Sequence, residues 1–276
     1  MSDWQSGELF ANGLCIHYTR TGGDKPPFVL SHGITDDGLC WTPVAKVLEP
    51  HYDVVMVDAR GHGRSEAPQE GYGPIEQAGD LAGVVAWLEL KKPILLGHSM
   101  GAVTTLVMAG FYPDLPGAIM LEDPPDWWMP AKQITPEVAE RFATGLKWMT
   151  DLKSKPRQQI IAEQRAAAPG WSEAELEPWV DSKLRFNPQV LSIFGPNPAA
   201  GVDWKATLGR ITCPALLITA DPALGSIVTE DSAKALKVLV PQLKIAHIPG
   251  AGHNIRREQF DQYLVAVRAF LDDVVK

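Results

Sequence analysis

The sequence predicts an α/β protein with a mostly parallel, eight-stranded sheet flanked by helices. Short apolar segments, β-branched or aliphatic throughout, alternate with segments of helical periodicity. The composition of the 276 residues, 45% hydrophobic and 21% charged, is that of a folded globular protein. The alternation breaks only once, at a long segment with no convincing strand. These features together favour one parallel sheet with a helical insertion.

The expected strands begin with a hairpin around Asn12-Gly13, a strong turn signal, whose arms are residues 7–12 and 14–20. Six later segments are apolar throughout, as strands covered on both faces are. They are residues 28–30, 53–58, 93–96, 117–121, 215–219 and 243–248.

Helical patterns lie between these strands, and right-handed crossovers would place them on both faces of the sheet. They are residues 42–48, 75–90, 102–112, 229–240 and 257–275. Residues 126–207 instead contain helical patches and six of the nine Trp residues. We expect a core domain of residues 1–125 and 208–276, and a helical cap of residues 126–207 inserted after the sixth strand.

Composition excludes several classes of function. The net charge of −8 and the absence of long basic runs argue against nucleic acid as a partner. Cys15, Cys40 and Cys213 are few and far apart, and no Cys-x-x-Cys pair or His/Cys cluster occurs, so we expect neither disulfides nor a metal site. The sequence also lacks a glycine-rich phosphate loop, so we expect no cofactor.

The uncharged stretch 93–113 is long enough to cross a bilayer, but its glycines favour a buried strand, a turn and a helix. The first ten residues lack the features of a secretion signal. We therefore expect a cytoplasmic monomer or homodimer with no membrane partner.

The motif Gly97-His98-Ser99-Met100-Gly101 lies between an expected strand and an expected helix. A sharp strand-to-helix turn strains its central residue and needs small neighbours, and it lifts the Ser99 hydroxyl above the sheet. The following helix supplies free N–H groups and the positive end of its dipole. The motif predicts that Ser99 is a nucleophile.

A serine hydroxyl needs a base to take its proton. Among the seven histidines, His253 alone follows the last strand in a glycine-containing loop, Pro249-Gly-Ala-Gly-His-Asn. That loop can bring the imidazole to the carboxyl edge of the sheet, where Ser99 is expected. We therefore predict that His253 is the base.

Four landmarks in this order resemble the α/β-hydrolases of the esterase, lactonase and ring-cleavage-product hydrolase type. They are residues 31–34 (SHGI), residues 58–65 (DARGHGRS), the Ser99 turn and residues 250–253 (GAGH). The resemblance covers essentially the whole chain and implies the α/β-hydrolase fold. It also implies that the backbone N–H groups of Ile34 and Met100 bind the oxyanion.

The resemblance leaves three candidates for the acid that orients His253. Its usual place, after the seventh strand, is occupied by Asp221, although about two residues early. Asp221 is the first candidate because no other acid lies between Asp203 and Glu230. Some relatives place the acid after the sixth strand, where Glu122 and Asp123 are the alternatives.

Trp41, Trp127 and Trp128 are the candidates for an apolar wall of the substrate pocket. Asp36 and Asp37 are expected to cap the helix at Trp41, although Asp37 could also reach the pocket mouth.

These residues together predict a serine hydrolase of small, largely apolar carboxylic esters or lactones that acts through an acyl-enzyme. A carbon–carbon bond hydrolase, a cofactor-free perhydrolase and a ligand-sensing receptor related to hydrolases are the alternatives. The acidic net charge favours an uncharged substrate.

Overall fold

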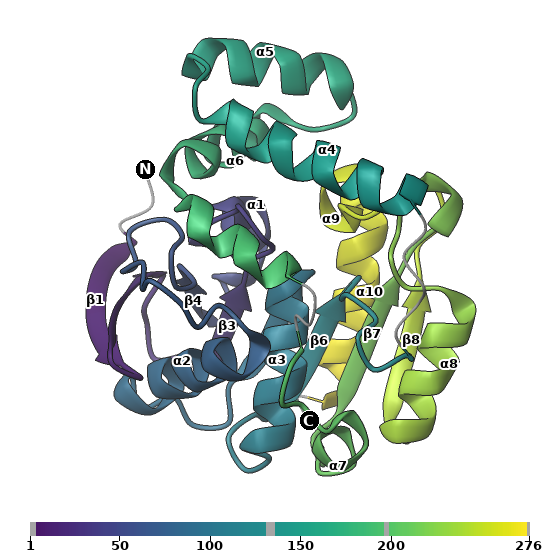
Figure 1. Cartoon of the computed structure of the whole chain (residues 1–276). Coiled ribbons are helices and arrows are strands. Elements are labelled where there is room, and N and C mark those ends of the chain that lie inside the picture. Colours follow the sequence, from purple (N-terminus) through teal and green to yellow (C-terminus); the bar gives the residue numbers. More distant parts are fainter. Residues whose placement is uncertain (1–3, 131–135, 196–198, 275–276) are drawn as a thin grey trace.

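The computed structural model describes residues 4–130, 136–195 and 199–274, and it confirms the predicted fold (Figure 1). The sheet has eight strands in the order β1-β2-β4-β3-β5-β6-β7-β8. β1 and β2 form the predicted hairpin, β2 is also antiparallel to β4, and the other neighbouring pairs are parallel. The strands are β1 (Gln5–Ala11), β2 (Leu14–Arg20), β3 (Pro27–Ser31), β4 (Asp53–Val57), β5 (Ile94–His98), β6 (Ala118–Glu122), β7 (Ala215–Thr219) and β8 (Leu243–His247).

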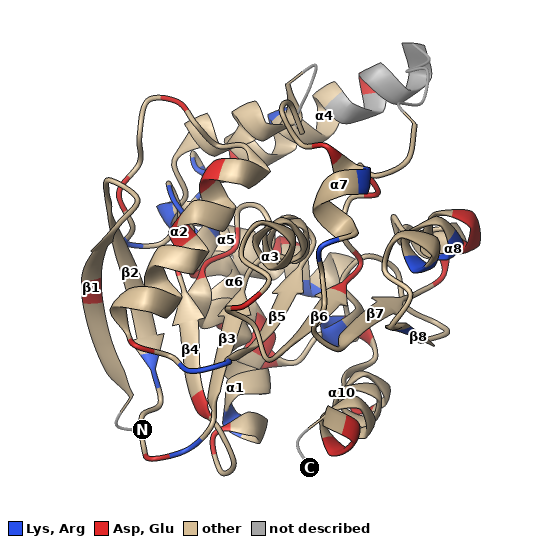
Figure 2. Ribbon diagram, turned by 90° about the horizontal axis from the view of Figure 1, so that it is seen from below, with Lys and Arg blue, Asp and Glu red and all other residues tan. Residues whose placement is uncertain are grey.

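Helices cover both faces of this sheet (Figure 2). One face packs against α1 (Thr42–Leu48), α9 (Ile255–Glu258) and α10 (Phe260–Val274), and the other against α2 (Pro74–Trp87), α3 (Met100–Phe111) and α8 (Glu230–Leu239). Successive strand residues point to opposite faces: Leu95 contributes to the second core, whereas Ile94 and Leu96 contribute to the first. Two covered faces explain why the central strands β4, β5, β6 and β7 are buried along their whole length and largely apolar.

The last predicted helix, residues 257–275, is divided in the structure. α9 ends at Glu258 and α10 begins at Phe260, because the φ of −136° and ψ of 57° at Gln259 are not helical. Residue 275 lies outside the described residues. The break changes the direction of the chain just after the loop that carries His253.

The described residues between β6 and β7 form helices joined by loops and contain no strand. These helices are α4 (Pro136–Leu152), α5 (Arg157–Ala167), α6 (Glu173–Arg185) and α7 (Trp204–Leu208), with 3-10 helix η2 at Pro188–Phe194. α4, α5 and α6 lie above the sheet edge at which β6 ends (Figure 1), whereas α7 packs against α3. α4, α5 and α6 share a small core that includes Leu152, Ile160 and Trp179.

Residues 93–113 form the predicted strand and helix, β5 and α3. Within the described part of the chain, no helix is both long and apolar enough to cross a membrane.

Candidate active site

Ser99 occupies the sharp turn between β5 and α3. Its φ of 52° and ψ of −115° lie in a region that side chains rarely adopt. A Cβ at Gly97 would clash with the backbone of Gly101, and a Cβ at Gly101 would clash with the carbonyl of Ser31. The two glycines therefore permit the close packing that holds Ser99 in its strained conformation.

Ser99, His253 and Asp123 form a continuous hydrogen-bonded chain at the carboxyl edge of the sheet. His253 Nε2 lies 3.0 Å from Ser99 Oγ, and His253 Nδ1 lies 2.6 Å from Asp123 Oδ2. With Nδ1–H donating to the carboxylate, Nε2 is left to accept the serine proton. The three residues lie 24 and 130 positions apart in sequence, and parallel strands bring them to one edge.

The carboxylate of Asp123 is fully buried and held by donors from the loop after β7. Ser226 Oγ lies 2.7 Å from Oδ1, and the backbone N–H groups of Val228 and Ile227 each donate at 2.9 Å. Asp123 itself has a φ of 40°, which turns the chain immediately after β6. These donors fix the position of the carboxylate.

The structure does not bring Asp221 to His253, which corrects the expectation from the sequence. Asp221 instead contacts His247 Nε2 at 3.0 Å and accepts a hydrogen bond of 2.7 Å from the backbone N–H of Gly250. Because Asp221 comes so soon after β7, its carboxylate faces the neighbouring end of β8. It stabilises the start of the loop that carries His253.

Glu122 also lies away from His253, because it is still part of β6 and points to the opposite face of the sheet from Leu121. Its carboxylate accepts hydrogen bonds from the backbone N–H of Arg256 at 3.0 Å and from the Arg256 guanidinium at 3.1 Å. The third candidate, Asp123, is thus the acid that contacts His253.

The backbone N–H groups expected to bind an oxyanion, those of Ile34 and Met100, belong to residues that line the pocket beside Ser99. Met100 is the first residue of α3, and the first N–H groups of a helix have no intrahelical acceptor. The N–H of Ile34 shares a peptide plane with the carbonyl of Gly33, which accepts hydrogen bonds from Asp36 N at 3.1 Å and His32 Nδ1 at 2.8 Å. Because the peptide is planar, these two bonds also fix the direction of the Ile34 N–H.

Three buried histidines hold the backbone around this turn as neutral rings. His32 Nε2 accepts a hydrogen bond from Ala59 N, so its Nδ1 carries the proton donated to Gly33. His62 Nε2 accepts from Thr35 N at 3.2 Å, and burial lowers the pKa of His62 to about 3. His98 Nε2 donates to the carbonyl of His253 at 3.0 Å, and burial keeps the pKa of His98 well below its ordinary value.

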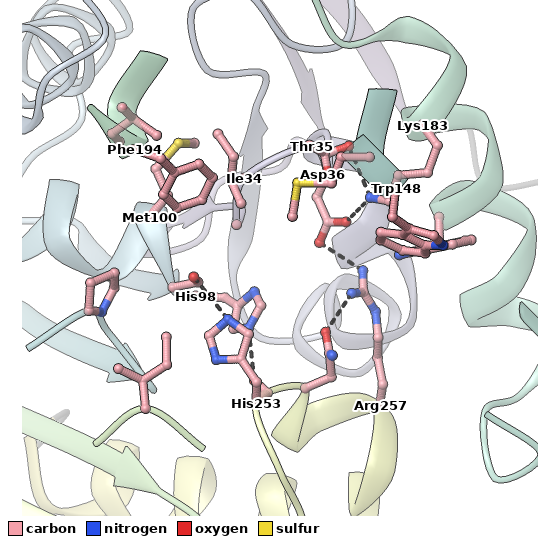
Figure 3. A pocket seen from close by; sticks show the side chains of 18 of the residues that line it. Ile34, Thr35, Asp36, His98, Met100, Trp148, Lys183, Phe194, His253 and Arg257 are labelled. Atoms are coloured by element: carbon pink, nitrogen blue, oxygen red, sulfur yellow. Dashed lines mark hydrogen bonds and ion pairs between the residues drawn. The ribbon is translucent and has the colours of Figure 1, made fainter. Parts of the chain in front are cut away.

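A cavity of about 290 Å³ opens beside Ser99. Figure 3 shows side chains that line it, among them Met100, Trp148 and His253. The walls of this cavity are mostly apolar, and the apolar part comes largely from the insertion between β6 and β7. The insertion contributes Trp127, Trp148, Met149, Trp171, Trp179, Ile193 and Phe194, and the core contributes Ile34, Met100, Pro125 and Ile227.

Of the four residues predicted to contact substrate, only Trp127 lines this cavity. Trp41 is fully buried under the guanidinium of Arg256, 4.1 Å from its ring centre. Trp128 is also buried, and its Nε1 donates to the carbonyl of Ser232 at 2.9 Å. Asp37 accepts from Leu39 N at 3.1 Å as the cap of 3-10 helix η1 (Gly38–Trp41), so only its capping role is confirmed.

Sequence reasoning missed a buried cluster of charges at the far side of the cavity. Lys183 Nζ donates to Asp36 Oδ1 at 2.7 Å, and Arg257 donates to Asp36 Oδ2 at 2.9 Å (Figure 3). Arg257 also donates to Glu175 at 3.2 Å. Burial alone would raise the pKa of Asp36, but the neighbouring Arg257, Lys183 and Arg256 hold it well below its ordinary value. No local pattern marks these charges as buried, because their partners are distant in sequence.

The fold and the hydrogen-bonded chain define this protein as an α/β-hydrolase. A profile of the alpha/beta hydrolase family matches residues 28–266, and the chain belongs to this family of hydrolases.

Relatives and solved structures resemble this chain over most of its length. N-formylmaleamate deformylase from Pseudomonas putida is 29% identical over 276 residues, which cover 96% of each chain. The 2-(acetamidomethylene)succinate hydrolase of Mesorhizobium japonicum is 26% identical over 92% of this chain and 90% of its own. A solved N-formylmaleamic acid deformylase from Pseudomonas putida has a TM-score of 0.79, at 24% identity, with 95% of this chain and 100% of that chain covered. An enol-lactonase from Burkholderia xenovorans has a TM-score of 0.73, at 23% identity over 96% of this chain and 100% of its own.

Proposed function

We propose that this chain is a serine hydrolase that cleaves carboxylic esters or lactones of small, largely apolar substrates through an acyl-enzyme. The observation that carries the proposal is the hydrogen-bonded chain from Asp123 through His253 to Ser99, with distances of 2.6 and 3.0 Å. Ser99 Oγ attacks the substrate carbonyl while His253 Nε2 takes its proton, and Asp123 stabilises the resulting imidazolium. The N–H groups of Ile34 and Met100 stabilise the oxyanion.

The same groups then complete the reaction. The imidazolium of His253 returns its proton to the departing alkoxide, which leaves Ser99 acylated. A water molecule, deprotonated by His253, attacks the acyl-enzyme and releases the carboxylic acid. His98 and Asp221 hold the backbone of the His253 loop during both steps, through the carbonyl of His253 and the N–H of Gly250.

The two cations that line the pocket, Lys183 and Arg257, are already bound to groups of the protein, which supports an uncharged substrate. Lys183 Nζ donates to Thr35 O, Asp36 Oδ1 and Ser182 Oγ, which engages all its donors. Arg257 is occupied by Asp36, Glu175 and Asn254. A substrate carboxylate would have to displace these internal partners, whereas the apolar walls favour an uncharged acyl group.

Amide hydrolysis is the second candidate, because two relatives matched over nearly their full lengths bear names of this chemistry: a deformylase of a maleamate and a hydrolase of an acetamidomethylene succinate. Their substrate names also denote carboxylates. Bond type and substrate charge are therefore the two properties that an experiment has to separate.

The experiment compares nitrophenyl butyrate, its carboxylated analogue nitrophenyl succinate, the nitroanilide of butyrate and a small lactone. We expect wild type to hydrolyse the uncharged ester with at least about tenfold higher kcat/KM than the carboxylated one, because a buried charge is costly. Ser99→Ala is expected to lose this activity by about 10⁴-fold or more, since the nucleophile is removed.

Each contrary outcome has a distinct meaning. Retained hydrolysis in Ser99→Ala would contradict the mechanism. A preference for the anilide would favour the amidase, and a preference for the succinate would contradict the uncharged substrate. Thermal stabilisation by the lactone without any turnover would favour a ligand-binding role.

A further inference from the structure

Helix α6 of the insertion contributes two cations to the loop that follows β3. Lys183 Nζ donates to the carbonyl of Thr35 at 3.0 Å and to the carboxylate of Asp36 at 2.7 Å. Both Lys183 and Asp36 are buried, with side chains 3% and 4% exposed. Arg185 Nε, two residues later, donates to Asp37 at 2.9 Å. The insertion is therefore joined to the core at the turn that carries Ile34.

Several polar groups of this turn, residues 33–36, have identifiable partners. The carbonyl of Gly33 accepts from His32 and from Asp36 N, and Thr35 N donates to His62. These partners belong to the core: His32 and Asp36 lie next to the turn or in it, and His62 lies in the loop after β4. The carbonyl of Thr35 is different, because its partner is Lys183 from the insertion.

We propose that Lys183 is a positioning residue for the oxyanion turn, so that the insertion contributes to catalysis as well as to the pocket wall. The inference rests on the proposed function, in which the Ile34 N–H stabilises the oxyanion. Thr35 has a φ of 63°, a left-handed conformation that costs energy unless its surroundings hold it. Lys183 helps to stabilise this conformation, because it donates hydrogen bonds to the carbonyl of Thr35 and to the carboxylate of Asp36.

The size of the expected effect follows from what the turn does. Complete loss of one oxyanion donor typically costs about 10²–10³ in rate. A turn that has lost Lys183 keeps its core partners, so we expect a partial loss of about tenfold. The loss belongs to the transition state, because the Ile34 N–H bonds more strongly to the oxyanion than to the ground-state carbonyl.

The experiment uses Lys183→Met, which keeps the length of the side chain and removes its charge and donors. Lys153→Met is the matched control. Lys153 Nζ also donates to two carbonyls, those of Leu184 at 2.8 Å and Phe186 at 2.6 Å, but both belong to the insertion and neither to the turn. We expect Lys183→Met to lower kcat about tenfold with KM changed less than about threefold, and Lys153→Met to keep the wild-type kcat.

A second readout needs no substrate. A fluorophosphonate reacts with an activated serine: the Ser99 Oγ–P bond forms, the P–F bond breaks, fluoride leaves and His253 takes the serine proton, while the phosphoryl oxygen occupies the oxyanion site. The labelling rate is followed by intact-protein mass spectrometry. We expect Lys183→Met to label about tenfold more slowly than wild type and Lys153→Met to label at the wild-type rate.

The outcomes separate this inference from the proposed function. Folded Lys183→Met that labels and turns over like wild type would overturn the role of Lys183, whatever the substrate is. Slow labelling of Lys183→Met beside a wild type that labels rapidly but cleaves no ester or lactone would support Lys183 and contradict the proposed substrate class.

Lys183→Arg serves if Lys183→Met does not fold, because it keeps the buried charge but displaces the donors from the carbonyl of Thr35. We expect its labelling to be at least about threefold slower than that of wild type, from a weakened hydrogen bond. A wild-type labelling rate in folded Lys183→Arg would overturn the inference.

Discussion

Asp123 and Asp221 are acids at the ends of neighbouring strands, and their surroundings separate their roles. Asp123 is fully buried, accepts hydrogen bonds from Ser226, Ile227 and Val228, and contacts the imidazole of His253. The side chain of Asp221 is 35% exposed and contacts His247 and the backbone of Gly250. Only Asp123 is placed to select the tautomer of His253.

Substitutions of Asp123 and Asp221 are expected to differ strongly in their effect on activity. Asp123→Asn is expected to lower kcat for an uncharged ester by about 10³–10⁴-fold, because an amide would no longer hold the imidazole in the correct tautomer. Asp221→Asn is expected to stay within about threefold of wild type, since it removes only hydrogen bonds at the start of the loop. Steady-state kinetics at pH 8 measure both. A severe loss in Asp221→Asn with near-normal Asp123→Asn would return the role to Asp221.

Helices α4 to α6 determine the shape of the pocket. Trp148 comes from α4 and Trp179 from α6, and their rings lie 6.5 Å apart, while Trp171 packs edge-on to Trp179 at 5.9 Å. Six of the nine Trp residues lie between residues 126 and 207, which the sequence shows plainly. Which of them face the pocket depends on how the helices pack against one another and on the core.

At the scale of this element, Trp148→Ala is expected to raise KM for an aromatic ester about three- to tenfold, because the ring is 44% exposed in the cavity wall and would be covered by the substrate. Trp87→Ala is the matched control: Trp87 on α2 is 54% exposed and lies away from the cavity. Both variants should unfold at temperatures close to that of wild type. Equal effects on KM in the two variants would contradict the pocket assignment.

The molecule as a whole buries ionisable groups whose pKa values differ between the folded and the unfolded states. Burial lowers the pKa of His62 to about 3, and the pKa values of His32 and His98 are lowered as well, again mainly by burial. Asp37 is opposite in sign: burial, together with the charge of Asp58, raises its pKa to about 6 against the opposing charge of Arg185.

These shifts predict how stability depends on pH. Below about pH 6.5, His62 is protonated in the unfolded state but not in the folded state. Lowering the pH from about 6.5 to about 3 therefore decreases the free energy of unfolding, by up to about 1.4 kcal/mol per pH unit. Asp37 opposes this below about pH 6, because there the folded state binds the additional proton.

Urea unfolding of wild type and His62→Gln between pH 7 and pH 5 isolates the contribution of His62, since Asp37 is present in both proteins. In the variant, the slope of the free energy of unfolding against pH should be smaller by the equivalent of about one proton. Parallel curves for the two proteins would show that His62 titrates normally in the folded state.

Local patterns in the sequence were sufficient to predict the fold, the turn at Ser99 and the hydrogen-bond partner of Ser99, which is His253. Strand and helix periodicity, the two glycines around Ser99 and the glycine-containing loop before His253 act over a few residues, and parallel connections then bring the strand ends to one edge. Tertiary structure decided which acid contacts His253, because Glu122, Asp123 and Asp221 differ in the direction of their side chains and in their distant partners. It also decided the pocket: Trp41 and Trp128 are buried elsewhere, and Lys183 reaches the oxyanion turn from a helix almost 150 residues away in the chain. Direction and long-range packing are not encoded in any local pattern, so only the folded chain shows them.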